Sequence, residues 1–114
     1  MKRLFSALIF SLQGIIAAFR DEAAFRQLVV LAVIGIGAAW LLPLSALAKI
    51  TLTFAHLFTL IVELLNTAIE AAIDRISEER HPLSKKAKDC GSAAQLIALI
   101  TLGGLWLVAL MSWI

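Results

Sequence analysis

The chain has 114 residues, of which 61% are hydrophobic and 16% are charged, and its formal net charge is +2. The hydrophobic share exceeds the roughly 45–50% of ordinary soluble domains and excludes a disordered or collagen-like chain. The single cysteine, Cys90, excludes a disulfide framework and a cysteine zinc site. The small net charge gives no argument for binding nucleic acid, and the length leaves room for one domain only.

The N-terminal segment, residues 1–20, has the pattern of an amphipathic helix. Its apolar residues recur at the spacing of one helical face, and most of its polar residues lie elsewhere. We predict a helix that lies in the membrane interface. The alternative is a cleaved signal peptide with Lys2 and Arg3 ahead of the apolar residues 4–10. Polar residues such as Ser6 interrupt the apolar core that a signal peptide needs.

Two uncharged runs, residues 27–48 and 90–114, are long enough to cross a bilayer. A transmembrane helix needs about 20 mostly apolar residues. The sequence therefore predicts transmembrane helices over 27–48 and 91–113, with a helix end near Leu42 because Pro43 follows. The runs also contain two pairs of small residues that favour close packing between helices, Gly35 with Gly37 and Gly103 with Gly104.

Residues 50–72 are predicted to form another transmembrane helix, although this segment carries acidic residues. Glu63, Asn66, Glu70 and Asp74 follow one another at steps of three or four, so they lie on one face of a helix. An ionisable group near the bilayer centre costs at least about 2.5 kcal/mol. These side chains are therefore expected to face protein, water or a cation. The alternative is a polar seam between helices, with Asn66 as a hydrogen-bonding contact.

The basic residues predict the orientation of the chain. Lys49 is the only one of the ten Lys and Arg residues that lies between the first two predicted spans. The others lie before the first span or near the predicted loop over 75–89, which places the N-terminus and this loop in the cytoplasm. The loop either is simply solvated or holds a polyphosphate against a metal. Trp40, Trp106 and Trp113 are interpreted as interfacial anchors or as lipid-facing bulk.

Acidic residues that lack His or Cys partners favour a hard cation such as magnesium. A second acidic pair, Asp21 and Glu22, precedes the first span, and its alternative role is to cap the N-terminus of that helix. Isolated His56 is expected to make a polar contact rather than to bind a ligand. The sequence has no phosphate-binding loop, no G-x-G-x-x-G motif and no soluble-kinase catalytic loop.

Several motifs resemble those of a known family in order and spacing. They are Glu22–Gln27, the ELLNTAIE run from Glu63 to Glu70, Asp74–Ile76, His81, Ala87–Asp89 and Gly91–Ala94. On these motifs the chain resembles the prokaryotic diacylglycerol kinase family over nearly its whole length. The resemblance implies one all-α membrane-embedded kinase domain over 1–114, with three transmembrane helices and an N-terminal amphipathic surface helix. It also implies a homotrimer with shared active sites in the bacterial inner membrane.

The resemblance further implies phosphorylation of diacylglycerol to phosphatidic acid, with ATP as co-substrate and Mg²⁺ as cofactor. By this likeness Glu63 is the general base, Asn66 positions the reacting groups, and Glu22 and Glu70 hold magnesium. The positions that match ATP contacts are Arg3, Phe10, Glu22, Glu70, Glu79, Arg80, His81, Lys88 and Asp89. The positions that match lipid contacts are Arg3, Glu63, Ser92 and apolar residues of the surface helix.

Three alternatives remain open at the level of sequence. Gln27 and the segment 88–94 resemble the diacylglycerol branch of the family, and an undecaprenol kinase is the alternative within it. A small transporter subunit would use Glu63 as an intramembrane carboxylate. A structural membrane protein would use Asn66 and the acidic residues only to join helices. Phe10 departs from the family, which often has a hydroxylated aromatic residue there.

Overall fold

The structure is a computed structural model that describes residues 1–112, in which all regular secondary structure is α-helical. The four helices are α1 (Lys2–Asp21), α2 (Ala23–Leu41), α3 (Ala46–Ile76) and α4 (Pro82–Met111). Trp113, the last residue of the predicted span 91–113, lies outside the described residues. Each of the four helices is long and apolar enough to cross a membrane by length and composition.

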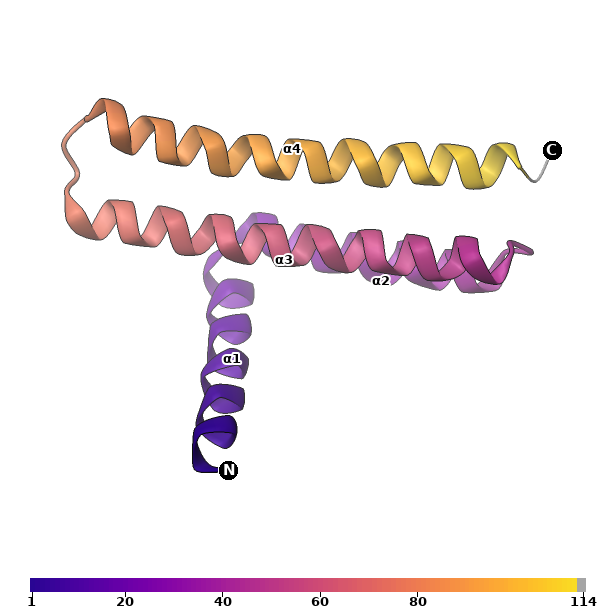
Figure 1. The fold of residues 1–114 in the computed structure, drawn as a ribbon, viewed down its shortest axis with the longest axis horizontal. Coiled ribbons are helices and arrows are strands. Elements are labelled where there is room, and N and C mark those ends of the chain that lie inside the picture. Colours follow the sequence, from indigo (N-terminus) through magenta and orange to yellow (C-terminus); the bar gives the residue numbers. More distant parts are fainter. Residues whose placement is uncertain (113–114) are drawn as a thin grey trace.

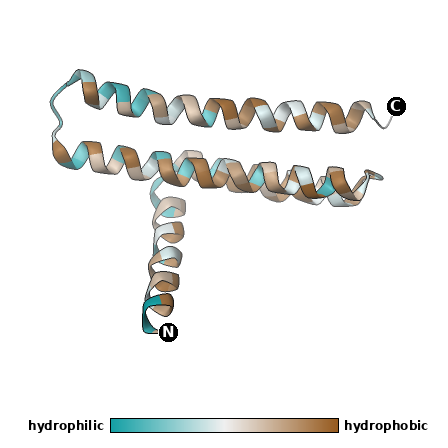
Figure 2. Ribbon diagram, viewed as in Figure 1, coloured by the Kyte–Doolittle hydropathy of each residue, from teal (hydrophilic) through white to brown (hydrophobic). Residues whose placement is uncertain are grey.

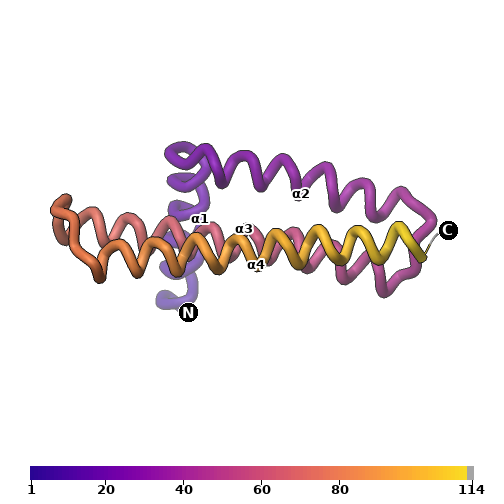
Figure 3. The backbone as a smooth tube through the Cα atoms, turned by 90° about the horizontal axis from the view of Figure 1, so that it is seen from above, coloured from indigo at the N-terminus to yellow at the C-terminus, as the bar shows by residue number. Residues whose placement is uncertain are grey.

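Helices α2, α3 and α4 run side by side, whereas α1 stands across this bundle (Figures 1 and 3). Helix α3 is the central element, because it packs against both α4 and α2. Helix α1 packs against α2 and α3, and no packing between α1 and α4 occurs within the described residues. The N-terminal helix is therefore attached to the bundle mainly through its C-terminal end.

The boundaries between the first three helices differ from the predicted spans. The backbone is extended at Glu22, which separates α1 from α2. Helix α2 ends at Leu41, which confirms the expected end near Leu42, so the helix stops short of the predicted limit at 48. Helix α3 begins before residue 50, because the Ser45 side chain caps it by accepting a hydrogen bond of 3.1 Å from the backbone N–H of Ala48.

The connection between α3 and α4 is shorter than the loop predicted over 75–89. Only residues 77–81 are non-helical there. Helix α4 starts early for two local reasons. Pro82 occupies its first turn, where a missing N–H costs nothing, and Nδ1 of His81 accepts a hydrogen bond of 3.1 Å from the N–H of Leu83. The last part of the predicted loop is therefore the first two turns of α4.

Most of the buried hydrophobic residues are alanines, whereas many large apolar residues are exposed. Ala39, Leu52 and Ala109 form a buried cluster where α2, α3 and α4 meet. Large side chains point outward, with Val33 68% and Ile100 65% exposed. Hydrophilic residues gather at the end where α3 meets α4, and hydrophobic colour dominates the rest of the bundle (Figure 2). An apolar exterior around a core rich in small residues is typical of helices that pack within a lipid bilayer.

Candidate active site

A row of buried polar side chains follows the face of α3 that packs against α4, and we call it the polar seam. Its members on α3 are His56, Thr59, Glu63 and Asn66, none more than 9% exposed. Their partners on α4 are Trp106, Gln95 and Gly91, in the reverse order along the chain. The two helices are antiparallel, so residues later in α3 contact residues earlier in α4. Part of the predicted acidic face therefore contacts protein rather than lipid.

Glu63 is held in this seam by Gln95. The Gln95 Nε2 group donates hydrogen bonds to Oε2 of Glu63 at 2.9 Å and to the Thr59 carbonyl at 3.0 Å. Glu63 is 8% exposed, and Gln95 is 9% exposed. The carboxylate of Glu63 thus has a fixed neighbour although it lies on the second half of a long apolar helix.

Asn66, the last member of the polar seam on α3, contacts Glu70 one turn further along the helix. Nδ2 of Asn66 donates a hydrogen bond of 3.3 Å to Oε1 of Glu70, and Oδ1 of Asn66 is buried without a hydrogen-bond partner. This oxygen lies against Gly91, where a Cβ atom would collide with it. The close approach of the two helices at this point requires glycine in α4. Asn66 therefore turns its amide nitrogen toward Glu70 and its unpaired oxygen toward Gly91 of α4.

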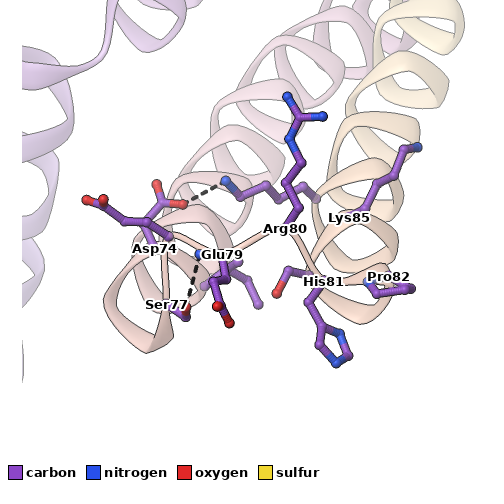
Figure 4. A pocket seen from close by; sticks show the side chains of 11 residues that line it. Asp74, Ser77, Glu79, Arg80, His81, Pro82 and Lys85 are labelled. Atoms are coloured by element: carbon purple, nitrogen blue, oxygen red, sulfur yellow. Dashed lines mark hydrogen bonds and ion pairs between the residues drawn. The ribbon is translucent and has the colours of Figure 1, made fainter.

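An open pocket of about 590 Å³ lies at the end of the bundle where α3 meets α4, and we call it the end pocket (Figure 4). Its volume falls within the range of about 300–1,000 Å³ typical of small-molecule sites. Four of the residues predicted to contact ATP line this pocket: Glu79, Arg80, His81 and Lys88. The other polar residues of its wall are Asp74, Ser77, Glu78, Ser84 and Lys85.

Lys88 spans from α4 to α3 in the end pocket. Its Nζ donates a hydrogen bond of 2.7 Å to Oδ1 of Asp74, drawn as a dashed line in Figure 4. This hydrogen bond raises the pKa of the Lys88 ammonium above its ordinary value. Lys88 is therefore cationic at neutral pH, as a phosphate-binding group must be. Predicted residue Asp89 does not line this pocket, because it faces outward and pairs with Lys85 one turn earlier.

Other predicted residues lie away from the end pocket. Arg3 and Phe10 are exposed on α1, which does not pack against α4 within the described residues. Ser92 is exposed on α4, and Glu22 is half-buried at the junction of α1 and α2. A separate apolar groove between α1, α2 and α3 is lined in part by apolar residues of the surface helix, but not by Arg3, Glu63 or Ser92. One copy of the chain thus brings together only part of the predicted site.

The acidic pair before α2 does not cap that helix through its side chains. Glu22 occupies the N-cap position, but its carboxylate makes no capping hydrogen bond. The Asp21 carboxylate instead accepts hydrogen bonds of 2.8 and 3.1 Å from Arg20, and this contact lowers the pKa of Asp21. The Asp21 carboxylate is therefore paired with Arg20, whereas the Glu22 carboxylate makes no capping contact and is available to bind another group.

The donor atoms near the seam fit magnesium by their chemistry. The Glu70 carboxylate and the unpaired Oδ1 of Asn66 are both hard oxygen donors on one face of α3. Within residues 1–112, no group of three or more His, Cys, Asp or Glu side chains is arranged to hold a metal ion. Magnesium that arrives with a nucleotide usually takes one or two carboxylates from the protein and its other ligands from phosphate and water.

His56 and Trp106 form the step of the seam farthest from the end pocket. Nε1–H of Trp106 donates a hydrogen bond of 3.0 Å to Nε2 of His56, which confirms the expected polar contact for His56. Trp106 is half-buried and uses its polar atom inside the bundle, while its interpretation as an interfacial anchor or lipid-facing bulk stays a prediction. Trp40 is 52% exposed, and its Nε1–H donates to Thr53.

Replacing Trp106 with phenylalanine is expected to lower the free energy of unfolding by about 1 kcal/mol, because Nε2 of buried His56 loses its donor. The measurement is unfolding by denaturing detergent in mixed micelles, followed by circular dichroism. Trp40→Phe is the control, since its hydrogen bond lies at the exposed end of α2. Equal effects of the two variants would contradict a special role for the buried pair.

Sequence reasoning missed Gln95 altogether. Its signal was present, because Gln95 is the only amide side chain between residues 90 and 114. It also lies four residues after Gly91 and seven after Lys88, on the same face of α4. An isolated amide in an apolar run, like an isolated acidic residue, predicts a hydrogen-bond partner inside the bundle, because neither side chain is stable facing lipid.

Comparison with known proteins agrees with these motifs. The family described as "Prokaryotic diacylglycerol kinase" matches residues 9–110. The "Diacylglycerol kinase" of Pseudomonas aeruginosa is 53% identical over 111 residues, covering 97% of this chain and 90% of the relative. The proteins of the same name from Escherichia coli K12 and Haemophilus influenzae are 43% and 41% identical, covering 96% and 93% of this chain and 90% of each relative. The chain therefore belongs to the prokaryotic diacylglycerol kinase family.

Proposed function

We propose that this protein is a membrane-embedded kinase that transfers the γ-phosphoryl group of ATP to diacylglycerol and releases phosphatidic acid and ADP. Its family and the names of its relatives support this activity. The observation that carries the proposal is the continuity of the polar seam with the end pocket. A row of Glu63, Asn66 and Glu70 leads along α3 to Asp74 and its cationic partner Lys88.

In the proposed arrangement α2, α3 and α4 cross the bacterial inner membrane, and α1 lies in its interface. The position of α1 across the other three helices supports this division (Figure 1). Phe5, at 66% exposed, and Leu8, at 56%, belong to its unpacked apolar surface. Because Lys2, Arg3 and the basic residues around the end pocket belong on the cytoplasmic side, the N-terminus is cytoplasmic as well.

Glu63 acts as general base in the proposed reaction. The diacylglycerol hydroxyl oxygen attacks the γ-phosphorus of ATP and gives its proton to the Glu63 carboxylate. The bond between the γ-phosphorus and the bridging oxygen breaks, and the electron pair leaves with ADP. Phosphoryl transfer needs mostly positioning and charge stabilisation, which Asn66 and Lys88 supply on either side of the reacting centre.

The nucleotide occupies the end pocket in this proposal, with its phosphates toward α3. Lys88 provides the fixed positive charge, and Glu79, Arg80 and His81 line the remainder of the pocket. Glu22 and Glu70 would hold the magnesium ion, which neutralises charge on the phosphates when bound. Lys88 then exchanges its contact with Asp74 for a phosphate oxygen.

A homotrimer with shared active sites completes the proposal. The end pocket is lined by residues of α3, α4 and the connection between them, whereas the predicted ATP contacts Arg3, Phe10 and Glu22 lie on or beside α1. A neighbouring copy can supply these side chains to the pocket. This division of the predicted site within one chain supports sites built between subunits.

The deciding experiment measures phosphate transfer from MgATP by the purified protein in mixed micelles, with diacylglycerol and undecaprenol offered separately. We expect transfer to diacylglycerol. Transfer to undecaprenol alone would keep the mechanism and replace the substrate. No transfer to either lipid, by protein that circular dichroism shows to be helical, would contradict the kinase and favour a transporter that uses Glu63.

A further inference from the structure

We infer that Gln95 is a positioning residue for the general base: its amide fixes one carboxylate oxygen of Glu63 and leaves the other oxygen to receive the proton of the lipid hydroxyl. This inference rests on the proposed function, because it assigns Gln95 a role only through Glu63. The juxtaposition that carries it is the double hydrogen bond from Gln95 on α4 to Glu63 and Thr59 on α3.

The orientation of the Gln95 amide is determined by its two partners. The Thr59 carbonyl oxygen and Oε2 of Glu63 both accept hydrogen bonds here, so the NH₂ group of Gln95 faces them. Reversing the amide would place an oxygen against the Thr59 carbonyl. Both N–H groups are used, one for each partner, and the side chain is 9% exposed. Gln95 therefore has no freedom to rotate without losing a buried hydrogen bond.

The second hydrogen bond of Gln95, to the Thr59 carbonyl, fixes its amide to the turn of α3 that carries Glu63. In an α-helix the carbonyl of a residue accepts the N–H four residues later, so the Thr59 carbonyl is paired with the N–H of Glu63. Thr59 is itself 1% exposed, and its hydroxyl donates a hydrogen bond of 2.7 Å to the His56 carbonyl. Gln95 is thus aligned with the backbone at Glu63 and contacts the carboxylate from that fixed point.

The two oxygens of Glu63 have different surroundings. Oε2 accepts the hydrogen bond from Gln95, whereas Oε1 accepts none from residues 1–112. Asn66, the next polar residue of the seam, donates to Glu70 instead and does not compete for Glu63. One oxygen is therefore occupied by protein, and the other remains available to a substrate hydroxyl. A general base needs this asymmetry, because the proton must arrive at a defined atom.

The buried amide of Gln95 carries a free-energy penalty that an apolar residue in the same place would not have. Its Oε1 is buried without a hydrogen-bond partner, and an unsatisfied buried acceptor is destabilising. An apolar side chain of similar size would avoid this penalty between two transmembrane helices. Retention of the amide is explained if its N–H groups serve the Glu63 carboxylate.

The test compares Gln95→Met with the unaltered protein and with Thr101→Val. Methionine has a similar length and no donor, while Thr101 is an exposed residue of α4 that bonds only to its own helix. We expect Gln95→Met to lower kcat by about 10- to 100-fold, with KM for ATP unchanged. Thr101→Val should retain full kcat. Full kcat for Gln95→Met would overturn the inference, as would a change confined to KM.

A double variant separates positioning from packing. In the Glu63→Gln background, Gln95→Met is expected to cause no further loss of residual transfer, because the group on which it acts is gone. An equal loss in both backgrounds would overturn the inference. If the methionine variant does not fold, Gln95→Asn is measured instead; it keeps the amide but shortens its reach, and the same loss of kcat is expected.

The same set of proteins distinguishes failure of this inference from failure of the proposed function. Full transfer by Glu63→Gln would remove the general base and the role of Gln95 together. Loss of transfer in Glu63→Gln, combined with full kcat in Gln95→Met, would overturn the inference alone. The opposite result, loss of kcat in both single variants without additivity, would support both assignments.

Discussion

Replacing Glu63 with glutamine is expected to reduce phosphoryl transfer to diacylglycerol by about 10²- to 10⁴-fold, the usual contribution of a positioned general base. Glutamine has nearly the same shape, and its carbonyl oxygen can still accept the hydrogen bond from Gln95. It cannot accept the proton of the lipid hydroxyl. The variant should therefore fold and bind ATP while it loses the chemical step.

The measurement is kcat with saturating MgATP and diacylglycerol in mixed micelles, together with KM for ATP. Asp21→Asn is the matched control, because it also removes a carboxylate, but one that is exposed and paired with Arg20. We expect the control to retain its activity. Transfer by Glu63→Gln within a few-fold of the unaltered protein would contradict the assignment of Glu63 as base.

Gly35 and Gly37 lie two residues apart on α2, so they project from nearly opposite sides of the helix. They are expected to respond to alanine in opposite directions. A Cβ at Gly35 would collide with the imidazole of His56, which is 2% exposed and held by Trp106. The ring has no room to yield, so Gly35→Ala should lower the free energy of unfolding by about 1–3 kcal/mol. A Cβ at Gly37 meets nothing within 4 Å. Gly37→Ala should be neutral or stabilising by up to about 1 kcal/mol, as alanine favours the helix.

Unfolding of both variants by denaturing detergent, followed by circular dichroism, gives this comparison directly. The two substitutions add the same methyl group to the same helix, so differences in helix propensity cancel between them. Equal stability of the two variants would show that α2 and α3 can separate at Gly35 without cost. It would then contradict the close approach of these helices.

The elements of the fold follow from local patterns, and for that reason sequence predicts them well. Pro43 ends α2 near Leu42 through backbone geometry alone, and the spacing of Glu63 and Asn66 places both on one face of α3. The early starts of α3 and α4 are harder to predict, because they depend on how the side chains of Ser45 and His81 bond to backbone N–H groups. Such caps shift helix ends by several residues.

The partners within the site are not local, and their prediction needs the register between helices. Nothing in the segment around Glu63 indicates that Gln95 lies opposite, since the pairing depends on how α3 and α4 turn back on each other at residues 77–81. The same holds for His56 with Trp106 and for Asn66 with Gly91. The glycine pairs show that residue type alone does not predict where helices pack closely. Close packing is expected at all four glycines of these pairs, but among them only Gly35 lies against a neighbouring side chain.

The short turn between α3 and α4 has a consequence for how the protein is made. Glu63 leaves the ribosome well before Gln95, its hydrogen-bond donor in the finished fold. Moving an unpaired carboxylate into the bilayer centre costs at least about 2.5 kcal/mol. Insertion of α3 is therefore more favourable after α4 has been synthesised and can supply the hydrogen-bond donor. Because only five residues connect the two helices, they can enter the bilayer together as a hairpin. Membrane insertion and the proposed general-base catalysis would then depend on the same two side chains, Glu63 and Gln95.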